Sequence, residues 1–174
     1  MWSSSTRGFT LAEILIVVVI LGILAAIIVP QFSNDSGDAR FTSTVQSLQS
    51  LRGQINLYRN QHGGRLPGTP GGSDDDATFV EQMTLSTNEQ GARSTAANRG
   101  FGDANFPCGP YLRNQLPANP FNGSRKVKTV TAFPATAPGG ELPTDPGWVY
   151  EITSGRIRVN RTGSAPAGTP FWSL

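Results

Sequence analysis

The 174-residue sequence predicts an α+β protein, in which one long N-terminal helix precedes a loop-rich domain that contains a small antiparallel β-sheet. Three observations predict this class. An apolar run over residues 14–29 leads into a helical amphipathic pattern over about 38–60. The chain contains 20 Gly and 13 Pro and only 15% charged residues, which favours many loops. Short stretches with alternating β-branched residues near the C-terminal end predict strands.

The apolar run is long enough to cross a membrane. From Phe9 to Val29 the sequence has one charged residue, Glu13, and one other polar side chain, Thr10. A helix of that length is about 31 Å long, close to the thickness of the hydrocarbon core of a bilayer. We therefore expect residues 9–30 to form a membrane-spanning helix.

Two features of this helix concern charge. Residues 1–8 carry one cation, Arg7, whereas Asp35 and Asp38 follow the apolar run. This pattern favours a single membrane pass with the N-terminus inside the cell and the remainder outside. Glu13 lies within the run, where a carboxylate costs on the order of 2.5–3.5 kcal/mol. Glu13 therefore requires a partner cation.

The start of the run suggests where that cation comes from. The stretch from Gly8 to Glu13, Gly-Phe-Thr-Leu-Ala-Glu, follows a short polar leader and resembles the processing motif of type IV prepilins and type II secretion pseudopilins. In that family a membrane-embedded aspartyl peptidase cuts after the Gly and methylates the new amino terminus. The resemblance implies that residues 1–8 are a leader, that the cut falls between Gly8 and Phe9, and that Phe9 becomes N-methylated.

Cleavage would create an α-ammonium at the start of the helix. This cation complements Glu13 of a neighbouring subunit staggered along a filament axis, and it also lies four residues from Glu13 in its own chain. At about 4 Å and an effective dielectric constant near 20, such a pair gains roughly 4 kcal/mol, similar to the cost of burying the carboxylate. We therefore expect Glu13 to serve filament assembly.

Two other interpretations of the N-terminal region stay open. A secretory signal peptide would be removed near Ala25-Ala26, although its apolar region is usually only about 7–15 residues long. An ordinary single-pass anchor with an incidental Glu13 is the second alternative.

Pro30 closes the apolar run. The family often has a Pro at this place, and the resemblance implies a helix kink or a locally melted segment that helps subunits to pack. The alternative is that Pro30 simply ends the membrane-spanning helix.

Residues 31–62 are expected to form the amphipathic half of the same helix. Gly63-Gly64 is expected to end it, and His62 is expected to be solvated at the helix end. The residues of the stripe recur at spacings of three and four and are Phe41, Val45, Leu48, Leu51 or Arg52, Ile55 and Tyr58.

Residues 63–174 are expected to form the loop-rich domain. Its stretch from Pro107 to Gly123, together with the end of the helix from Leu57 to Pro67, resembles the major pseudopilin of type II secretion. A strand is expected within 126–133. A hairpin is expected from 148 to 160, with its turn at Ser154-Gly155 and with Ile157 and Val159 facing the helix.

A metal site is suggested only by the acidic cluster Asp74, Asp75 and Asp76, whose oxygens suit calcium. Major pseudopilins bind calcium in a loop of the sheet region, but the cluster also fits a solvated group that caps a short helix over about 77–83. No other cofactor is expected. Cys108 is the only cysteine, so no intramolecular disulfide can form, and a buried apolar role is expected for it.

No catalytic constellation is present, because the single His62 and the single Cys108 lie far apart in the sequence; we expect no enzyme activity. Scattered basic residues also argue against nucleic-acid binding. The resemblance implies a subunit of the type II secretion pseudopilus that resides in the cytoplasmic (inner) membrane with a periplasmic domain before it joins the filament. Its implied partners are copies of itself, minor pseudopilins, the assembly platform and the prepilin peptidase. The alternatives are a type IV pilin for adhesion, motility or DNA uptake, and a membrane-anchored binding domain that never polymerises.

Overall fold

The computed structural model describes residues 8–69, 76–94, 104–165 and 168–174, and for residues 27–36 it describes the backbone only. The chain divides into two compact units, residues 1–39 and 40–174. Helix α1 (Leu11–Gln61) begins in the first unit and ends in the second.

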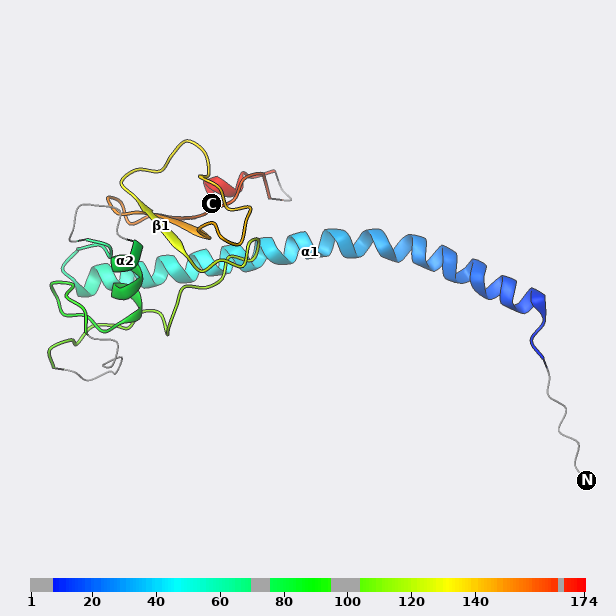
Figure 1. Cartoon of the computed structure of the whole chain (residues 1–174), viewed down its shortest axis with the longest axis horizontal. Helices are drawn as coiled ribbons and strands as arrows, with labels where there is room; N and C mark the ends of the chain where they lie inside the picture. Colours follow the sequence, from blue (N-terminus) through cyan, green and yellow to red (C-terminus); the bar gives the residue numbers. More distant parts are fainter. Residues whose placement is uncertain (1–7, 70–75, 95–103, 166–167) are drawn as a thin grey trace, which may run out of the picture. The chain divides into compact units, whose positions relative to one another are not determined.

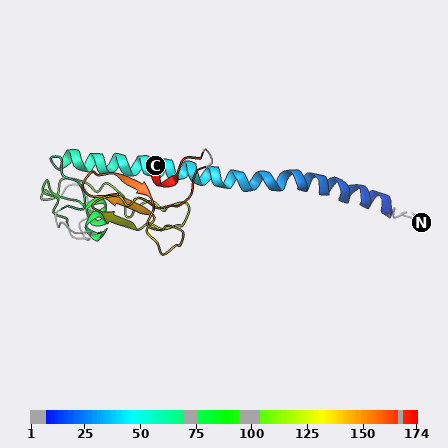
Figure 2. The same ribbon diagram turned by 90° about the horizontal axis from the view of Figure 1, so that it is seen from above.

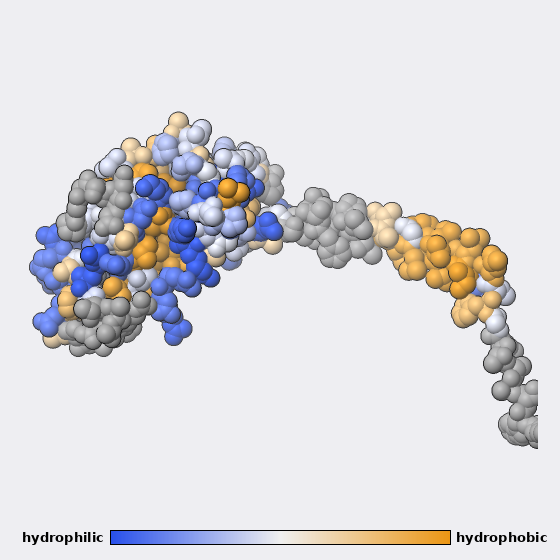
Figure 3. Space-filling view, viewed as in Figure 1, coloured by the Kyte–Doolittle hydropathy of each residue, from blue (hydrophilic) through white to orange (hydrophobic). Residues whose placement is uncertain are grey.

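In the first unit the described side chains of α1 are almost all apolar and exposed. Leu11 is 85% exposed, and the large apolar residues from Ile14 to Leu24 are 48–61% exposed. Figure 3 shows them as a nearly continuous hydrophobic surface. An apolar surface of this extent is typical of a segment that lipid or protein covers.

In the second unit α1 packs one side into the core of the domain. Leu48, Leu51, Ile55 and Tyr58 are at most 2% exposed, so the predicted amphipathic pattern is confirmed. Val45, which was expected on the same side, is only half-buried.

Helix α1 ends at Gln61, and two glycines follow it with positive φ, 61° at Gly63 and 89° at Gly64. The N–H of Gly64 donates to the carbonyl of Arg59 at 2.8 Å, the six-residue closure of a Schellman motif. The prediction that Gly63-Gly64 ends the helix is confirmed.

Helix α2 (Asp76–Thr84) corresponds to the short helix predicted over 77–83. It buries Phe79 and Met83 completely, and the ring of Phe79 lies 4.3 Å from that of Tyr150. Burial of a side chain of this size contributes about 1.5–3 kcal/mol to stability, so packing rather than helix length holds α2 in place.

The sheet has three strands in the order β1 (Val127–Val130), β2 (Trp148–Glu151), β3 (Ile157–Val159). The α+β class is confirmed, but the expectation of a purely antiparallel sheet is wrong because β1 pairs with β2 in parallel. The connection over residues 131–147 is long enough to return the chain to the end of the sheet where β1 began.

The predicted hairpin is confirmed. β2 and β3 pair antiparallel, with Tyr150 opposite Ile157 and Trp148 opposite Val159. Ile157 and Val159 are fully buried, whereas Arg158 between them is half-buried.

The core lies between the second half of α1 and the sheet, which run side by side in Figures 1 and 2. Trp148 is its largest fully buried side chain, and the indole N–H donates to the carbonyl of Pro117 at 2.9 Å. The 3₁₀ helix η1 (Phe171–Ser173) adds Phe171, whose ring lies 4.8 Å from that of Phe121. This core holds the second unit together independently of the apolar residues of the first.

Candidate functional site

The first turn of α1 carries a reciprocal pair of polar residues. One carboxylate oxygen of Glu13, Oε2, accepts hydrogen bonds from the backbone N–H and from the hydroxyl of Thr10, both at 2.8 Å. The backbone N–H of Glu13 donates to Thr10 Oγ1 at 3.2 Å. Because α1 begins at Leu11, Thr10 is the N-cap and Glu13 is the third helical residue, which is the arrangement of a capping box.

Sequence reasoning identified Glu13 but missed the structural role of Thr10. The signal was available, since a Thr followed three residues later by a Glu at the start of an apolar run is the signature of a capping box. The exchange of hydrogen bonds gives the helix a defined first residue, and it engages the carboxylate within its own chain.

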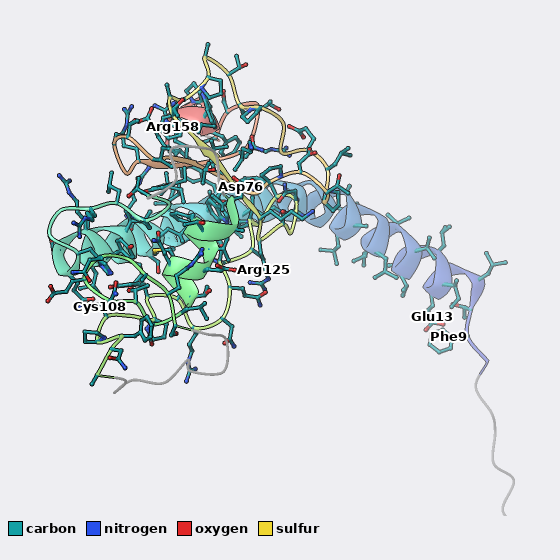
Figure 4. All side chains as sticks on the ribbon, turned by 60° about the vertical axis from the view of Figure 1, so that its left-hand side comes forward. Phe9, Glu13, Asp76, Cys108, Arg125 and Arg158 are labelled. Atoms are coloured by element: carbon teal, nitrogen blue, oxygen red, sulfur yellow. The ribbon has the colours of Figure 1, made fainter. Side chains whose placement is uncertain are left out.

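The residues expected at the processing position lie directly before the helix. Gly8 is exposed and non-helical, and Phe9 is 79% exposed. Phe9 and Glu13 lie together at the start of α1, as Figure 4 shows. A peptide bond in such a segment is accessible to a protease, whereas one inside a helix is not.

The electrostatic character of the site follows from its surroundings. Glu13 is the acidic residue of the first turn, and Leu11, Ile14 and Leu15 around it are 52–85% exposed and apolar. Once lipid or protein covers such an apolar surface, a carboxylate within it is costly unless a cation pairs with it.

Other predicted features of this region are only partly covered by the structure. Residues 1–7, most of the expected leader, lie outside the described residues. The backbone is helical through Pro30, so Pro30 does not end α1. The predicted kink at Pro30 stays a prediction. Within the described part of the chain, no helix reaches the combined length and hydropathy of a membrane-spanning segment.

Of the three candidate calcium ligands, the structure describes only Asp76. Asp74 and Asp75 lie outside the described residues. Asp76 begins α2, and its Oδ1 accepts hydrogen bonds from the backbone N–H and the hydroxyl of Thr129 at 2.6 and 2.7 Å. Over the described ranges, no three His, Cys, Asp or Glu side chains form a group able to hold a metal ion. Asp76 thus joins α2 to β1.

The expectation that His62 is solvated is wrong. Its side chain is 1% exposed, and its ring stacks on that of Tyr58 with centroids 3.7 Å apart. His62 lies four residues after Tyr58, so it continues the buried side of the helix, and this spacing was a readable signal. Cys108 is buried and unpaired, as predicted.

The comparisons with known proteins agree with the motif at the start of the helix. Residues 3–29 match the family described as the prokaryotic N-terminal methylation motif. The chain is similar to the type II secretion system core protein G of Klebsiella pneumoniae, with 30% identity over 123 residues that cover 70% of this chain and 73% of the relative. It is similar to the core protein G of Dickeya chrysanthemi, with 38% identity over 121 residues, 70% of this chain and 67% of the relative.

A shorter similarity links the chain to the prepilin peptidase-dependent protein D of Escherichia coli strain K12, with 39% identity over 67 residues, 38% of this chain and 45% of the relative. No solved structure gives a significant match.

Proposed function

Because this chain belongs to the family of the type II secretion system core protein G, the major pseudopilins, we propose that it is cut between Gly8 and Phe9 and polymerises through Glu13 into a secretion pseudopilus. Members of this family are structural proteins and not enzymes. The family assignment therefore agrees with the expectation that the chain has no catalytic activity, and it favours secretion over a type IV pilus.

The motif and the exposure of the segment around Gly8 and Phe9 support the proposed processing step. The matched methylation motif includes Gly8 and Phe9, and a relative is named for its dependence on prepilin peptidase. Gly8 and Phe9 are exposed and precede the first helical residue, so a peptidase can bind the segment without unwinding α1. Methylation of the new amine at Phe9 keeps its positive charge.

The observation that carries the assembly step is the carboxylate of Glu13 amid exposed apolar residues, held only by Thr10 among its described contacts. The ammonium of a processed Phe9 on the next subunit gains roughly 4 kcal/mol with Glu13 at about 4 Å. This gain offsets the roughly 2.5–3.5 kcal/mol that the carboxylate costs in a lipid-covered helix. Stacking thereby adds a cation from the next subunit to the ammonium that lies four residues from Glu13 in its own chain.

The apolar surface of the first unit supports a membrane location of the subunit before assembly. We place residues 9–30 in the cytoplasmic (inner) membrane as a single pass, with the N-terminus inside and the second unit in the periplasm. Lipid covers the exposed residues between Ile14 and Leu24 before assembly, and neighbouring copies cover them afterwards. The assembly platform, the minor pseudopilins and the prepilin peptidase are the remaining proposed partners.

The second half of α1 also suits contact with another copy. Ser50, Gly53 and Leu57 are exposed on the side turned away from the core, and Leu57 is 44% exposed. Between residues 41 and 58 the only charge is Arg52, which donates to the carbonyl of Ile157 at 3.2 Å. An uncharged helix surface packs against a neighbour without the desolvation of ions.

The decisive experiment replaces Glu13 by Gln in the full chain and compares it with Glu81→Gln, which neutralises an exposed carboxylate of α2. We expect Glu13→Gln to lower the fibre yield and the secretion of substrate at least about tenfold, since a loss of 1.4 kcal/mol suffices for that factor. Glu81→Gln should match the wild type. Mass spectrometry should find a mature wild-type protein that begins with methylated Phe9.

Two results would contradict the proposal. A native N-terminus other than Phe9 would remove the cation that Glu13 needs. Unchanged fibre yield and secretion with Glu13→Gln would mean that Glu13 does not serve assembly, which would favour a membrane-anchored domain that does not polymerise.

The contact surface on α1 has its own test. Leu57→Glu should lower the fibre yield without changing processing. Arg59→Glu, at an exposed residue on another side of the same helix about 160° away, should not. Equal yields from the two variants would exclude this side of α1 from the contact.

A further inference from the structure

His62 is held in its neutral form at the end of α1. Its Nδ1 lies 2.8 Å from the carbonyl oxygen of Tyr58, and its Nε2 lies 2.9 Å from Thr87 Oγ1. A carbonyl oxygen only accepts hydrogen bonds, so Nδ1 carries the proton and Nε2 accepts from the hydroxyl of Thr87. Both ring nitrogens are satisfied without a positive charge, at a side chain that is 1% exposed.

Thr87 belongs to a small ladder that packs against this end of the helix. Thr87 and Cys108 exchange backbone hydrogen bonds at 2.8 and 2.9 Å, and the N–H of Ser94 donates to the carbonyl of Ser86 at 2.8 Å. The hydrogen bond between His62 and Thr87 is therefore a buried link between α1 and residues 86–94.

We propose that the contact between His62 and Thr87 is an acid-sensitive latch, which holds residues 86–94 against the end of α1 near neutral pH and releases them when the imidazole is protonated. The latch goes beyond the assembly function and does not depend on it. It concerns the end of α1 in the second unit, whereas processing and Glu13 concern its start.

The groups around the ring decide the direction of the effect. Burial lowers the pKa of His62, and the nearby guanidinium of Arg65 lowers it further. Hydrogen bonds to the backbone of Tyr58 and Asn88 and the carboxylate of Glu89 raise it, but the net pKa stays below its ordinary value. The other titratable neighbours, Tyr58, Tyr111 and Cys108, are uncharged near neutral pH, because burial raises the pKa of each of them and that of Tyr58 reaches about 12.

The stack on Tyr58 acts against the latch, since an aromatic face attracts a cation. This attraction is smaller than the penalty for a buried cation that has no anionic partner in contact. Glu89 is not such a partner, because it is exposed and no ion pair joins it to His62. Burial therefore decides the outcome, and protonation favours a conformation in which the ring reaches water.

The pH window follows from the sign of the pKa shift. In the released conformation His62 regains its ordinary pKa of about 6.5, while in the closed conformation the pKa is lower. As the pH falls below about 6.5, the released conformation binds a proton that the closed one does not, so release becomes more favourable until the closed-state pKa is reached. At pH 5 the largest possible gain in the release equilibrium is about thirtyfold.

Hydrogen–deuterium exchange of the full chain in detergent micelles tests the latch. After correction for intrinsic rates, the protection of the amides of residues 86–94 should fall by about threefold to thirtyfold between pH 7 and pH 5. Amides of β2 should keep their protection. His62→Gln, which offers one donor and one acceptor but does not titrate, should lose the pH dependence.

Two charge variants test the mechanism without removing the ring. Each variant is compared with its own protection at pH 7. Arg65→Gln should show a smaller loss at pH 5, because a higher closed-state pKa lets the closed conformation bind the proton as well, and Glu89→Gln should show a larger loss. Constant protection of 86–94 in the wild type, the same loss in His62→Gln, or equal losses in the two charge variants would each overturn the proposal. If His62→Gln does not fold, the two charge variants still test the latch.

Discussion

Thr10 and Glu13 hold one another at the first turn of α1, where one carboxylate oxygen accepts both the N–H and the hydroxyl of Thr10 at 2.8 Å. In the proposed assembly the carboxylate of Glu13 pairs with the ammonium of a neighbouring subunit. Within its own chain this carboxylate is already hydrogen-bonded to Thr10. An incoming ammonium has to share or replace these hydrogen bonds, so Thr10 influences how readily Glu13 changes partner.

The capping box predicts a local effect of Thr10→Ala. Loss of the side-chain oxygen should destabilise the first turn of α1 by about 1 kcal/mol, whereas Thr10→Ser, which keeps an oxygen in the same place, should have little effect. Amide exchange over residues 11–14 in lipid bicelles measures this difference. Identical protection in the Ala and Ser variants would mean that the capping box does not stabilise the helix start.

The contact between Asp76 and Thr129 predicts a larger, global effect. Asp76→Ala leaves the N–H and the hydroxyl of the fully buried Thr129 without their acceptor, at about 1–3 kcal/mol for each group. We expect a loss of roughly 2–4 kcal/mol in the free energy of unfolding, measured by urea denaturation.

Glu81→Gln is the matched control in the same helix. It removes the ion pair of Glu81 with Arg93, whose side chains are 49% and 37% exposed, and such pairs contribute at most about 1 kcal/mol. If Asp76→Ala were no more destabilising than Glu81→Gln, Asp76 would not be the clamp between α2 and β1.

The carboxylate of Glu151 predicts a second, more acidic pH dependence. Hydrogen bonds from Ser154, Arg156 and the backbone N–H of Phe133 hold its pKa below the ordinary value of 4.5. Its contribution is therefore complete above pH 4.5 and is lost as the pH falls through the folded-state pKa. Glu151→Gln should flatten the acid limb of stability below pH 4.5 and leave the His62-dependent change below pH 6.5 intact. If the loss of stability below pH 4.5 is unchanged in Glu151→Gln, other carboxylates cause that loss.

Gly140 lies against the backbone of Asn160, so a larger side chain at this position should clash. Gly140 has φ 103°, and a Cβ added there would lie 1.8 Å from the backbone oxygen of Asn160. Gly163 has φ 81° and open space around it, so Gly163→Ala should cost only the conformational strain, about 1–2 kcal/mol. Gly140→Ala should lower the thermal midpoint clearly more than Gly163→Ala. Equal midpoints would show that the loop around Gly140 yields to the added methyl group.

Short-range patterns were sufficient to predict much of the fold. The processing position between Gly8 and Phe9 also came from such a pattern and stays a prediction. The spacing of Leu48, Ile55 and Tyr58 predicted which side of α1 is buried, and Ser154-Gly155 predicted the hairpin turn. Glu13 was recognisable because a charge in an apolar run is conspicuous. His62 was misassigned because it was considered as a helix end and not as the next residue on the buried side.

The α+β class, the long helix with its glycine end and the β2–β3 hairpin were predictable, because each depends mainly on patterns among residues that are close together in the chain. The Thr10–Glu13 pair has an equally local signal, although its role was missed. The parallel pairing of β1 with β2, the burial of His62 against Thr87 and the contact of Asp76 with Thr129 became evident only in the folded chain, because they join residues that are far apart in the sequence. Asp76 and Thr129 are 53 residues apart, and their contact exists only after α2 and β1 have packed.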